Sequence, residues 1–214
     1  MKVKVCCISS VEEAEMAIEA GADYLGLVGP MPSGPGVISL EEIATIAEHV
    51  RGKVETVLLT SEQHVSDIAS MHMVACTSCV QIVDKLLKGS YQDLRYAIGG
   101  AQIIQVLHVL DESCIKEALD LAQQVDIVLL DSGNPNAETK TLGGTGRTHN
   151  WEISAEIVKQ LDIPVFLAGG LRKENIEKAR TQVNPYGLDV CSGLRTEGKL
   201  DEMKLKEFLS KVRA

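Results

Sequence analysis

The chain has 214 residues, 45% of them hydrophobic, and a formal net charge of −9. This length and apolar content allow one large α/β domain or two small ones, with a core that must be aliphatic because only 3% of the residues are aromatic. The acidic balance argues against nucleic-acid or anionic-membrane partners, which need a basic surface, although a small anion can still bind to local N–H groups.

The N-terminal sequence MKVKVCCISS is too short and too polar for a signal peptide, and no apolar run reaches the length of a membrane span. We therefore expect a cytoplasmic protein with no membrane partner. Without an export signal, the six cysteines are expected to be reduced thiols. These are Cys6, Cys7, Cys76, Cys79, Cys114 and Cys191.

Apolar strand patterns alternate with amphipathic helical patterns from one end of the chain to the other. The first strand is expected at residues 3–8, and Ser9 or Ser10 begins a helix that Gly21 ends. Further strands are expected at residues 24–28, 53–60, 79–83, 102–108, 126–130, 164–168 and 188–191. Further helices are expected at residues 39–49, 61–73, 91–98, 112–123, 151–161, 173–181 and 201–212.

These elements form eight strand-helix units with no linker or shift in composition. Unbroken alternation at this length predicts a closed (β/α)₈ TIM barrel with eight parallel strands, as one domain over residues 1–214. An open doubly wound sheet is the alternative, but it would usually have fewer strands and a phosphate loop after the first.

Asp131 stands where the apolar run 127–130 ends. Four consecutive apolar residues predict a fully buried strand, so the carboxylate after them would lie in the mouth of the barrel, where catalytic residues collect. Its function would be general acid catalysis, which needs a carboxyl group kept protonated by partial desolvation. The other interpretation is a turn residue that precedes Ser132.

Strand alternation gives opposite directions to the adjacent thiols Cys6 and Cys7. Cys7 would pack outward with Val3 and Val5, while Cys6 and Lys4 would point into the barrel, where Lys4 is also a possible substrate contact. Cys6 is thus a candidate base, provided that a nearby cation such as Lys4 lowers the thiol pKa from its reference value of about 8.5. The alternative is a small buried core cysteine, which is common.

Three glycine-rich loops predict a site for a small phosphorylated substrate. GGTG occupies residues 143–146, LAGGL residues 167–171 after the seventh strand, and CSGL residues 191–194 after the eighth. Each could be a turn, but loops after strands seven and eight are where barrels bind phosphate with N–H groups. The expected phosphate ligands are Gly144, Thr145, Gly146, Gly169, Gly170, Ser192 and Gly193.

Three further polar features are less specific. His108, at the end of the strand 102–108, is either a substrate contact or a structural residue, and Arg147 is either an anion clamp or a solvated charge. Cys76 and Cys79 form a lone C-x-x-C without the four ligands that zinc requires, so no metal site is expected.

Several motifs, in this order and spacing, resemble the phosphoribosylanthranilate isomerase family, a (β/α)₈ enzyme of tryptophan biosynthesis. They are KVCC at 4–7, EAGADYLGLV at 19–28, LLDS at 129–132, GGTGRTHNW at 143–151, LAGGL at 167–171 and DVCSGLRTEGKLDEMKLKEF at 189–208. The resemblance implies that Cys6 is the general base and Asp131 the general acid of an Amadori rearrangement that uses no cofactor. We expect a monomer or a homodimer.

The chain departs from the family pattern at three places. Gly36 stands where the family has an arginine for the anthranilate carboxylate, residues 81–84 replace the motif QLHG, and Cys7 replaces a common glycine. Arg147 or His108 could hold the carboxylate instead. Two alternatives remain: an isomerase for a phosphosugar with another aglycone, and a non-catalytic phosphate-binding barrel. The presence of both Cys6 and Asp131 favours an enzyme, because a pure binder needs neither.

Overall fold

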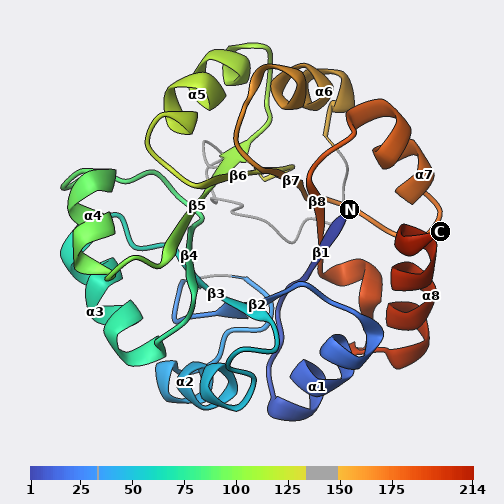
Figure 1. Ribbon diagram of the computed structural model, residues 1–214, viewed down its shortest axis with the longest axis horizontal. Helices are drawn as coiled ribbons and strands as arrows, with labels where there is room; N and C mark the ends of the chain where they lie inside the picture. Colours follow the sequence, from blue (N-terminus) through green and yellow to red (C-terminus); the bar gives the residue numbers. More distant parts are fainter. Residues whose placement is uncertain (33, 134–148) are drawn as a thin grey trace.

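The structure is a computed structural model that describes residues 1–32, 34–133 and 149–214. Eight parallel strands in this part of the chain close into a barrel in sequence order, with the helices outside (Figure 1). The strands are β1 (Lys2–Val5), β2 (Tyr24–Val28), β3 (Glu55–Thr60), β4 (Cys79–Ile82), β5 (Gln102–His108), β6 (Ile127–Asp131), β7 (Val165–Leu167) and β8 (Gly187–Val190). Pairing of β1 with β8 closes the sheet, which confirms the predicted (β/α)₈ barrel.

The helices begin where the sequence supplies caps. The Ser10 hydroxyl accepts a hydrogen bond from the Glu13 N–H, and Ser39 forms a capping box with Glu42. The helices are α1 (Val11–Ala20), α2 (Leu40–His49), α3 (Val65–Ala75), α4 (Tyr91–Ala97), α5 (Ser113–Ala122), α6 (Trp151–Gln160), α7 (Ile176–Lys178) and α8 (Glu202–Arg213). Within the described ranges, no helix has both the length and the apolar character needed to cross a lipid bilayer.

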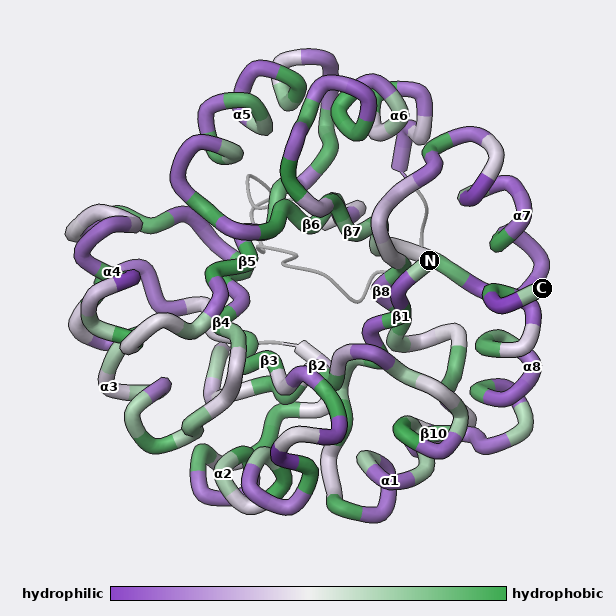
Figure 2. Tube along the Cα trace, in the orientation of Figure 1, coloured by the Kyte–Doolittle hydropathy of each residue, from purple (hydrophilic) through white to green (hydrophobic). Residues whose placement is uncertain are grey.

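The apolar residues form two separate cores. The larger one fills the layer between strands and helices and contains Val3 and Val5; the smaller one fills the barrel interior and contains Leu59, Val106 and Phe166. Figure 2 shows the matching pattern, with mostly hydrophobic strands at the centre and helices whose hydropathy alternates along each turn. The barrel interior is therefore packed rather than an open channel.

The prediction that Cys7 packs outward is wrong. Cys7 belongs to the inner core together with Cys6, because β1 already ends at Val5 and strand alternation no longer applies beyond it. Cys7 also has φ 64°, a left-handed conformation that is uncommon for a residue with a side chain. The chain thus turns at Cys7 and brings two adjacent thiols to the same side.

The region from β7 to α8 differs most from the sequence expectation. The helix expected at 173–181 begins only at Ile176 and continues as a π-helix, Ala179–Val183. The delay has a local cause: the Asn175 side chain accepts from the Arg172 N–H and donates to the Gly170 carbonyl, which holds the preceding loop in a turn. A short hairpin, β9 (Arg195–Thr196) with β10 (Lys199–Leu200), was not expected from the sequence.

Candidate active site

The two residues expected to do acid-base chemistry both lie at the carboxyl-terminal ends of barrel strands. Asp131 is the last residue of β6 and is 7% exposed; Cys6 follows the end of β1 and is also 7% exposed. The inward direction predicted for each side chain is confirmed, since Cys6 belongs to the inner core, as do Ile127 and Leu129, which share a strand face with Asp131.

Below this mouth, the barrel interior contains an ion pair between its first and last strands. Lys4 of β1 and Asp189 of β8 are register partners, and Lys4 Nζ lies 2.9 Å from Asp189 Oδ1. Lys4 is completely buried. Burial opposes its charge, but the Asp189 carboxylate outweighs that effect and raises the pKa of Lys4 above its usual value. Lys4 therefore stays a cation inside the barrel.

Gly26 of β2 makes room for both Lys4 and Cys6. A Cβ atom on Gly26 would lie 2.9 Å from Cys6 Sγ and 3.1 Å from Lys4 Nζ. The thiol and the ammonium group thus border the same small space, which only a residue without a side chain leaves open. The negative form of Cys6 is one of the influences that raise the pKa of Lys4, so the two groups interact electrostatically.

The environment of Asp131 favours its protonated form. Burial raises the pKa of this carboxyl group above its usual value, and the negative charge of Asp189 adds to the effect. The Ser132 backbone N–H, 2.7 Å from Oδ1, and His108 act in the opposite direction but do not cancel it. The two interpretations of Asp131 are thus compatible, because the carboxyl group that accepts the turn hydrogen bond from Ser132 is also the one whose pKa is raised.

His108 ends β5 beside Asp131 and is 8% exposed. Its Nε2 lies 3.1 Å from the Val83 carbonyl oxygen, which can only accept, so Nε2 carries a proton and donates it. Its Nδ1 is buried and has no hydrogen-bond partner among the described residues. The Nδ1 nitrogen of His108 is therefore available to form a hydrogen bond with a molecule bound in the mouth of the barrel.

The glycine-rich loops after β7 and β8 lie against each other. Gly169 and Gly170 have φ angles of 84° and 62°, which favour glycine. A Cβ atom on Gly193 would be only 2.2 Å from the Leu171 carbonyl oxygen, so the two loops can approach this closely only with glycine there. Ser192 begins a 3₁₀ turn, Ser192–Leu194. Gly144, Thr145, Gly146 and Arg147 lie outside the described residues.

Two of the three departures from the family pattern touch each other. Gly36 has φ 72°, and a Cβ atom there would lie 2.7 Å from the Cβ atom of Cys7. An arginine at position 36 would collide with Cys7 in this backbone conformation. The two substitutions therefore belong together structurally, although nothing in the sequence alone indicates that they are in contact.

Asp189 and Arg195 were missed as site residues. The only signal for Asp189 was an acid within an apolar strand pattern. Arg195 lies 3.1 Å from Glu13 Oε1 and donates to the carbonyl groups of Cys6 and Cys7. It thereby ties the loop after β8 to the end of β1, a contact across almost the whole length of the chain.

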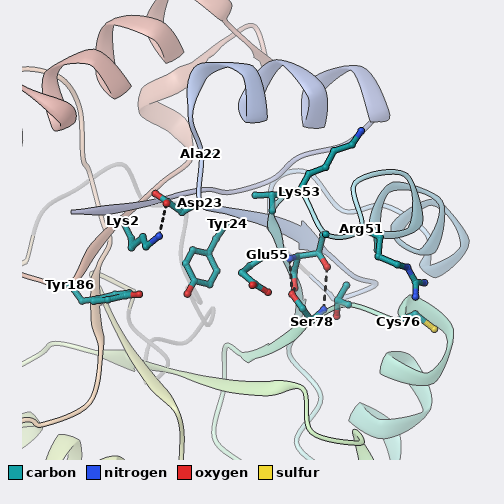
Figure 3. A pocket seen from close by; sticks show the side chains of 15 residues that line it. Lys2, Ala22, Asp23, Tyr24, Arg51, Lys53, Glu55, Cys76, Ser78 and Tyr186 are labelled. Atoms are coloured by element: carbon teal, nitrogen blue, oxygen red, sulfur yellow. Dashed lines mark hydrogen bonds and ion pairs between the residues drawn. The ribbon is translucent and has the colours of Figure 1, made fainter.

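A cavity of about 600 Å³ opens at the opposite end of the barrel, at the amino-terminal ends of the strands (Figure 3). Its wall includes Tyr24, Glu55 and Tyr186 as well as Lys2 and Asp23, which pair at 2.9 Å. Barrel enzymes carry their chemistry at the carboxyl-terminal end. This cavity is therefore separate from the site that contains Cys6 and Asp131.

Comparison with known proteins places the chain in one family. The model of the family described as "N-(5'phosphoribosyl)anthranilate (PRA) isomerase" matches residues 3–211. N-(5'-phosphoribosyl)anthranilate isomerase 2 of Methanosarcina mazei is 35% identical, with 100% of this chain and 94% of that protein aligned. The N-(5'-phosphoribosyl)anthranilate isomerase of Pelobacter propionicus is also 35% identical, over 98% of this chain and 94% of the relative.

The fold agrees with the same comparison. The crystal structure of phosphoribosyl anthranilate isomerase from Thermotoga maritima superposes with a TM-score of 0.82 at 26% identity, covering 100% of this chain and 98% of that one. The enzyme from Pyrococcus furiosus gives a TM-score of 0.80 at 26% identity and the same coverage.

The buried ion pair predicts a specific pattern of stability changes. Lys4→Met should lower the free energy of unfolding by about 3–5 kcal/mol, because it leaves the Asp189 carboxylate buried without a partner. The double variant Lys4→Met/Asp189→Asn should recover more than half of that loss, since it removes both charges. Urea denaturation of the wild type, Lys4→Met, Asp189→Asn and the double variant measures this. Additive losses in the double variant would mean that the two side chains do not interact.

The raised pKa of Asp131 predicts how stability depends on pH. Below the ordinary carboxyl pKa of about 3.9, Asp131 is protonated in the folded and unfolded states alike. At higher pH the unfolded chain releases the proton first, so the wild type loses stability until the pH passes the folded-state pKa. Asp131→Asn should therefore be more stable than wild type at about pH 8.

Thermal denaturation between about pH 4 and pH 8 measures this difference, which should shrink toward the acidic end. A wild type that remains the more stable protein at the alkaline end would show that the folded state favours the ionised carboxylate.

Proposed function

We propose, on the premise that this chain belongs to the phosphoribosylanthranilate isomerase family, that Asp131 is the general acid and Cys6 the general base of its reaction. The reaction is the Amadori rearrangement of N-(5-phosphoribosyl)anthranilate to 1-(2-carboxyphenylamino)-1-deoxyribulose 5-phosphate, a step of tryptophan biosynthesis. The observation that carries the assignment is the pair of environments at the mouth: one carboxyl group whose pKa burial raises above its usual value, and one thiol beside a buried ammonium group.

Asp131 starts the reaction by donating its proton to the ribose ring oxygen. The bond from C1′ to that oxygen then breaks, the anthranilate nitrogen supplies the electron pair, and a Schiff base forms. The raised pKa of Asp131 supports this role, because a general acid must still hold its proton near neutral pH. Its hydrogen bond from the Ser132 N–H fixes the carboxyl group in one orientation.

Cys6 then removes the proton from C2′, which gives an enolamine that tautomerises to the ketose. A thiol removes such a proton only as a thiolate. The Lys4 ammonium group, held by Asp189 and adjacent to Cys6 across the space at Gly26, compensates the negative charge on the sulfur. We propose Lys4 as the positioning residue for this charge rather than as a substrate contact, since Lys4 is completely buried.

The loops after β7 and β8 bind the phosphate group in this proposal. Their glycines allow close approach of the backbone, and the N–H groups of Ser192 and Gly193 begin a 3₁₀ turn, where no acceptor of the same turn is available. Gly169 and Gly170 supply the second wall. The third, at Gly144, Thr145 and Gly146, remains a prediction, as does the role of Arg147.

The aglycone end differs from the family pattern. With Gly36 packed on Cys7, the arginine expected for the anthranilate carboxylate has no counterpart at that position. We propose His108 in its place: its buried Nδ1 lies in the wall beside Asp131 with no partner among the described residues, and when that nitrogen also carries a proton it can donate to the carboxylate. The same departure also favours, as a second candidate, a related phosphosugar with a different aglycone. A monomer or homodimer and a cytoplasmic location remain predictions.

Removing either proton-transfer group should stop the reaction without preventing binding. We expect Asp131→Asn and Cys6→Ala each to lower kcat by about 10²–10⁴-fold. The decay of the substrate's fluorescence, with the substrate generated in situ, measures turnover. Cys79→Ala is the matched control, because it removes another buried thiol of the inner core but from the start of β4; its kcat should stay close to that of the wild type.

Binding separates a catalytic defect from a folding defect. The probe is reduced 1-(o-carboxyphenylamino)-1-deoxyribulose 5-phosphate, the compound held by one related isomerase, titrated calorimetrically into wild type and Asp131→Asn. Similar affinities with lost turnover support the assignment. Parallel loss of both would make Asp131 a structural residue, and a folded wild type that binds the probe but leaves the substrate unchanged would favour the other aglycone.

The contact between positions 7 and 36 predicts a coupling. Gly36→Arg alone should cost about 1–2 kcal/mol of folding free energy, because φ is positive and its Cβ atom meets that of Cys7. The same substitution in a Cys7→Gly background should cost less, since the closest contact is gone. A double-mutant cycle of urea denaturation measures the difference, and equal costs in both backgrounds would refute the contact.

A further inference from the structure

We propose that Cys7 and Cys191 form a site of reversible oxidative modification, at which hydrogen peroxide converts the two thiols to a disulfide that joins the first barrel strand to the loop after the last. The two Sγ atoms lie 2.8 Å apart and are free thiols. A disulfide is about 2.05 Å long, so less than 1 Å of movement separates the reduced pair from the bonded one.

The backbone holds the two cysteines in place from several sides. The Cys6 N–H donates to the Val190 carbonyl at 2.9 Å, which joins the residues next to each thiol. The Arg195 guanidinium group donates a second hydrogen bond, to the Cys7 carbonyl oxygen. Because these contacts fix the positions of both Cα atoms, the thiols meet without a rearrangement of the barrel.

Cys7 also occupies a conformation that its side chain disfavours. Its φ of 64° is easy for glycine and strained for a residue with a Cβ atom. A strained position persists when the surrounding structure determines it, and such positions concentrate at functional sites. The residue in this strained conformation is the one whose thiol lies 2.8 Å from the Cys191 sulfur.

The two thiols are suited to different steps of the oxidation. Cys191 is partly exposed and Cys7 is buried. The hydrogen bond between the two thiols, together with Arg195, lowers the pKa of Cys191, while the same hydrogen bond and burial raise the pKa of Cys7. Cys191 is thus the thiol that a solvent-borne oxidant reaches and that loses its proton more easily, and Cys7 is the resolving thiol.

The chemistry balances in two steps. The Cys191 thiolate attacks one oxygen of the peroxide, the O–O bond breaks, and the departing hydroxide takes a proton to form water, which leaves a sulfenic acid on Cys191. The Cys7 sulfur then attacks the Cys191 sulfur; the S–O bond breaks, and the hydroxide leaves with the Cys7 proton as a second water. Two thiols have lost two hydrogens, and one peroxide has become two waters. A dithiol reductant reverses the change.

The test is direct identification of the bond in the whole protein. Purified protein is treated with a small excess of hydrogen peroxide, denatured, alkylated and digested with trypsin. We expect a cross-linked peptide pair that contains residues 7 and 191, lighter by two hydrogens than the separate peptides and absent after treatment with dithiothreitol. Cys76, Cys79 and Cys114 should remain alkylated.

The neighbouring thiol provides the matched control, because Cys6 lies in the same tryptic peptide as Cys7. The cross-link should persist in Cys6→Ala and disappear in Cys7→Gly, where the backbone conformation is easy for the new residue, and in Cys191→Ser. A cross-link that is lost in Cys6→Ala, a bond between Cys6 and Cys7, or a sulfinic acid on Cys191 without any cross-link would each overturn the proposal.

Thermal denaturation gives an independent reading. The bond would join residues 184 positions apart in the sequence, so it should restrict the unfolded chain strongly and raise Tm by roughly 5–15 °C in the oxidised wild type. Oxidised Cys7→Gly should show no such rise. An oxidised wild type with unchanged or lower Tm would mean that the bond does not form in the native geometry.

Discussion

The buried pair of Lys4 and Asp189 is the interaction on which the rest of the site depends. The pair crosses the β1–β8 junction, where the barrel closes, with 2.9 Å between charged atoms. Taking two charges out of water is expensive, so an ion pair at this place contributes less to stability than apolar side chains of the same volume could. The role of the ion pair is instead to hold the Lys4 ammonium group beside Cys6. The same strands that close the barrel therefore also set the charge around the candidate base.

That arrangement imposes further requirements on its neighbours. Gly26 has to lack a side chain, because the Lys4 ammonium and the Cys6 sulfur fill the space above it. The negative charge of Asp189, which neutralises Lys4, also helps to raise the pKa of Asp131. The Asp189 carboxylate thus disfavours negative charge at Asp131 and favours positive charge at Lys4, which lies beside Cys6. The candidate acid, the candidate base and the cation are therefore linked electrostatically rather than independent.

The sequence predicted those parts of the fold that local pattern controls. The strands at 24–28 and 102–108 and the cap at Ser39 agree with the structure, because an apolar run and a serine before acidic residues act locally. Cys6 and Asp131 were placed correctly since one sits beside a regular strand and the other at its end. The direction of Cys7 was not predictable, because it depends on a left-handed φ after the strand has ended. The partners Asp189 and Arg195 are determined by contacts between distant parts of the chain, which no local pattern records.

The backbone conformation at the mouth of the barrel therefore differs from that of the strands. In the body, apolar side chains alternate and the backbone is regular. At the mouth, Cys7 and Gly36 both have positive φ and pack on each other, and Gly169 and Gly170 repeat that conformation in the loop after β7. Irregular backbone after β1 lets two consecutive side chains, Cys6 and Cys7, belong to the inner core, which a regular strand cannot do because its side chains alternate between faces. Because Cys7 and Gly36 are in contact, a change at one alters what the other can be, and the departure of this chain from its family at the aglycone end is one structural change rather than two. The thiol that this change introduces then lies against Cys191, so the altered end of the site and the thiol pair have a common origin in the turn after β1.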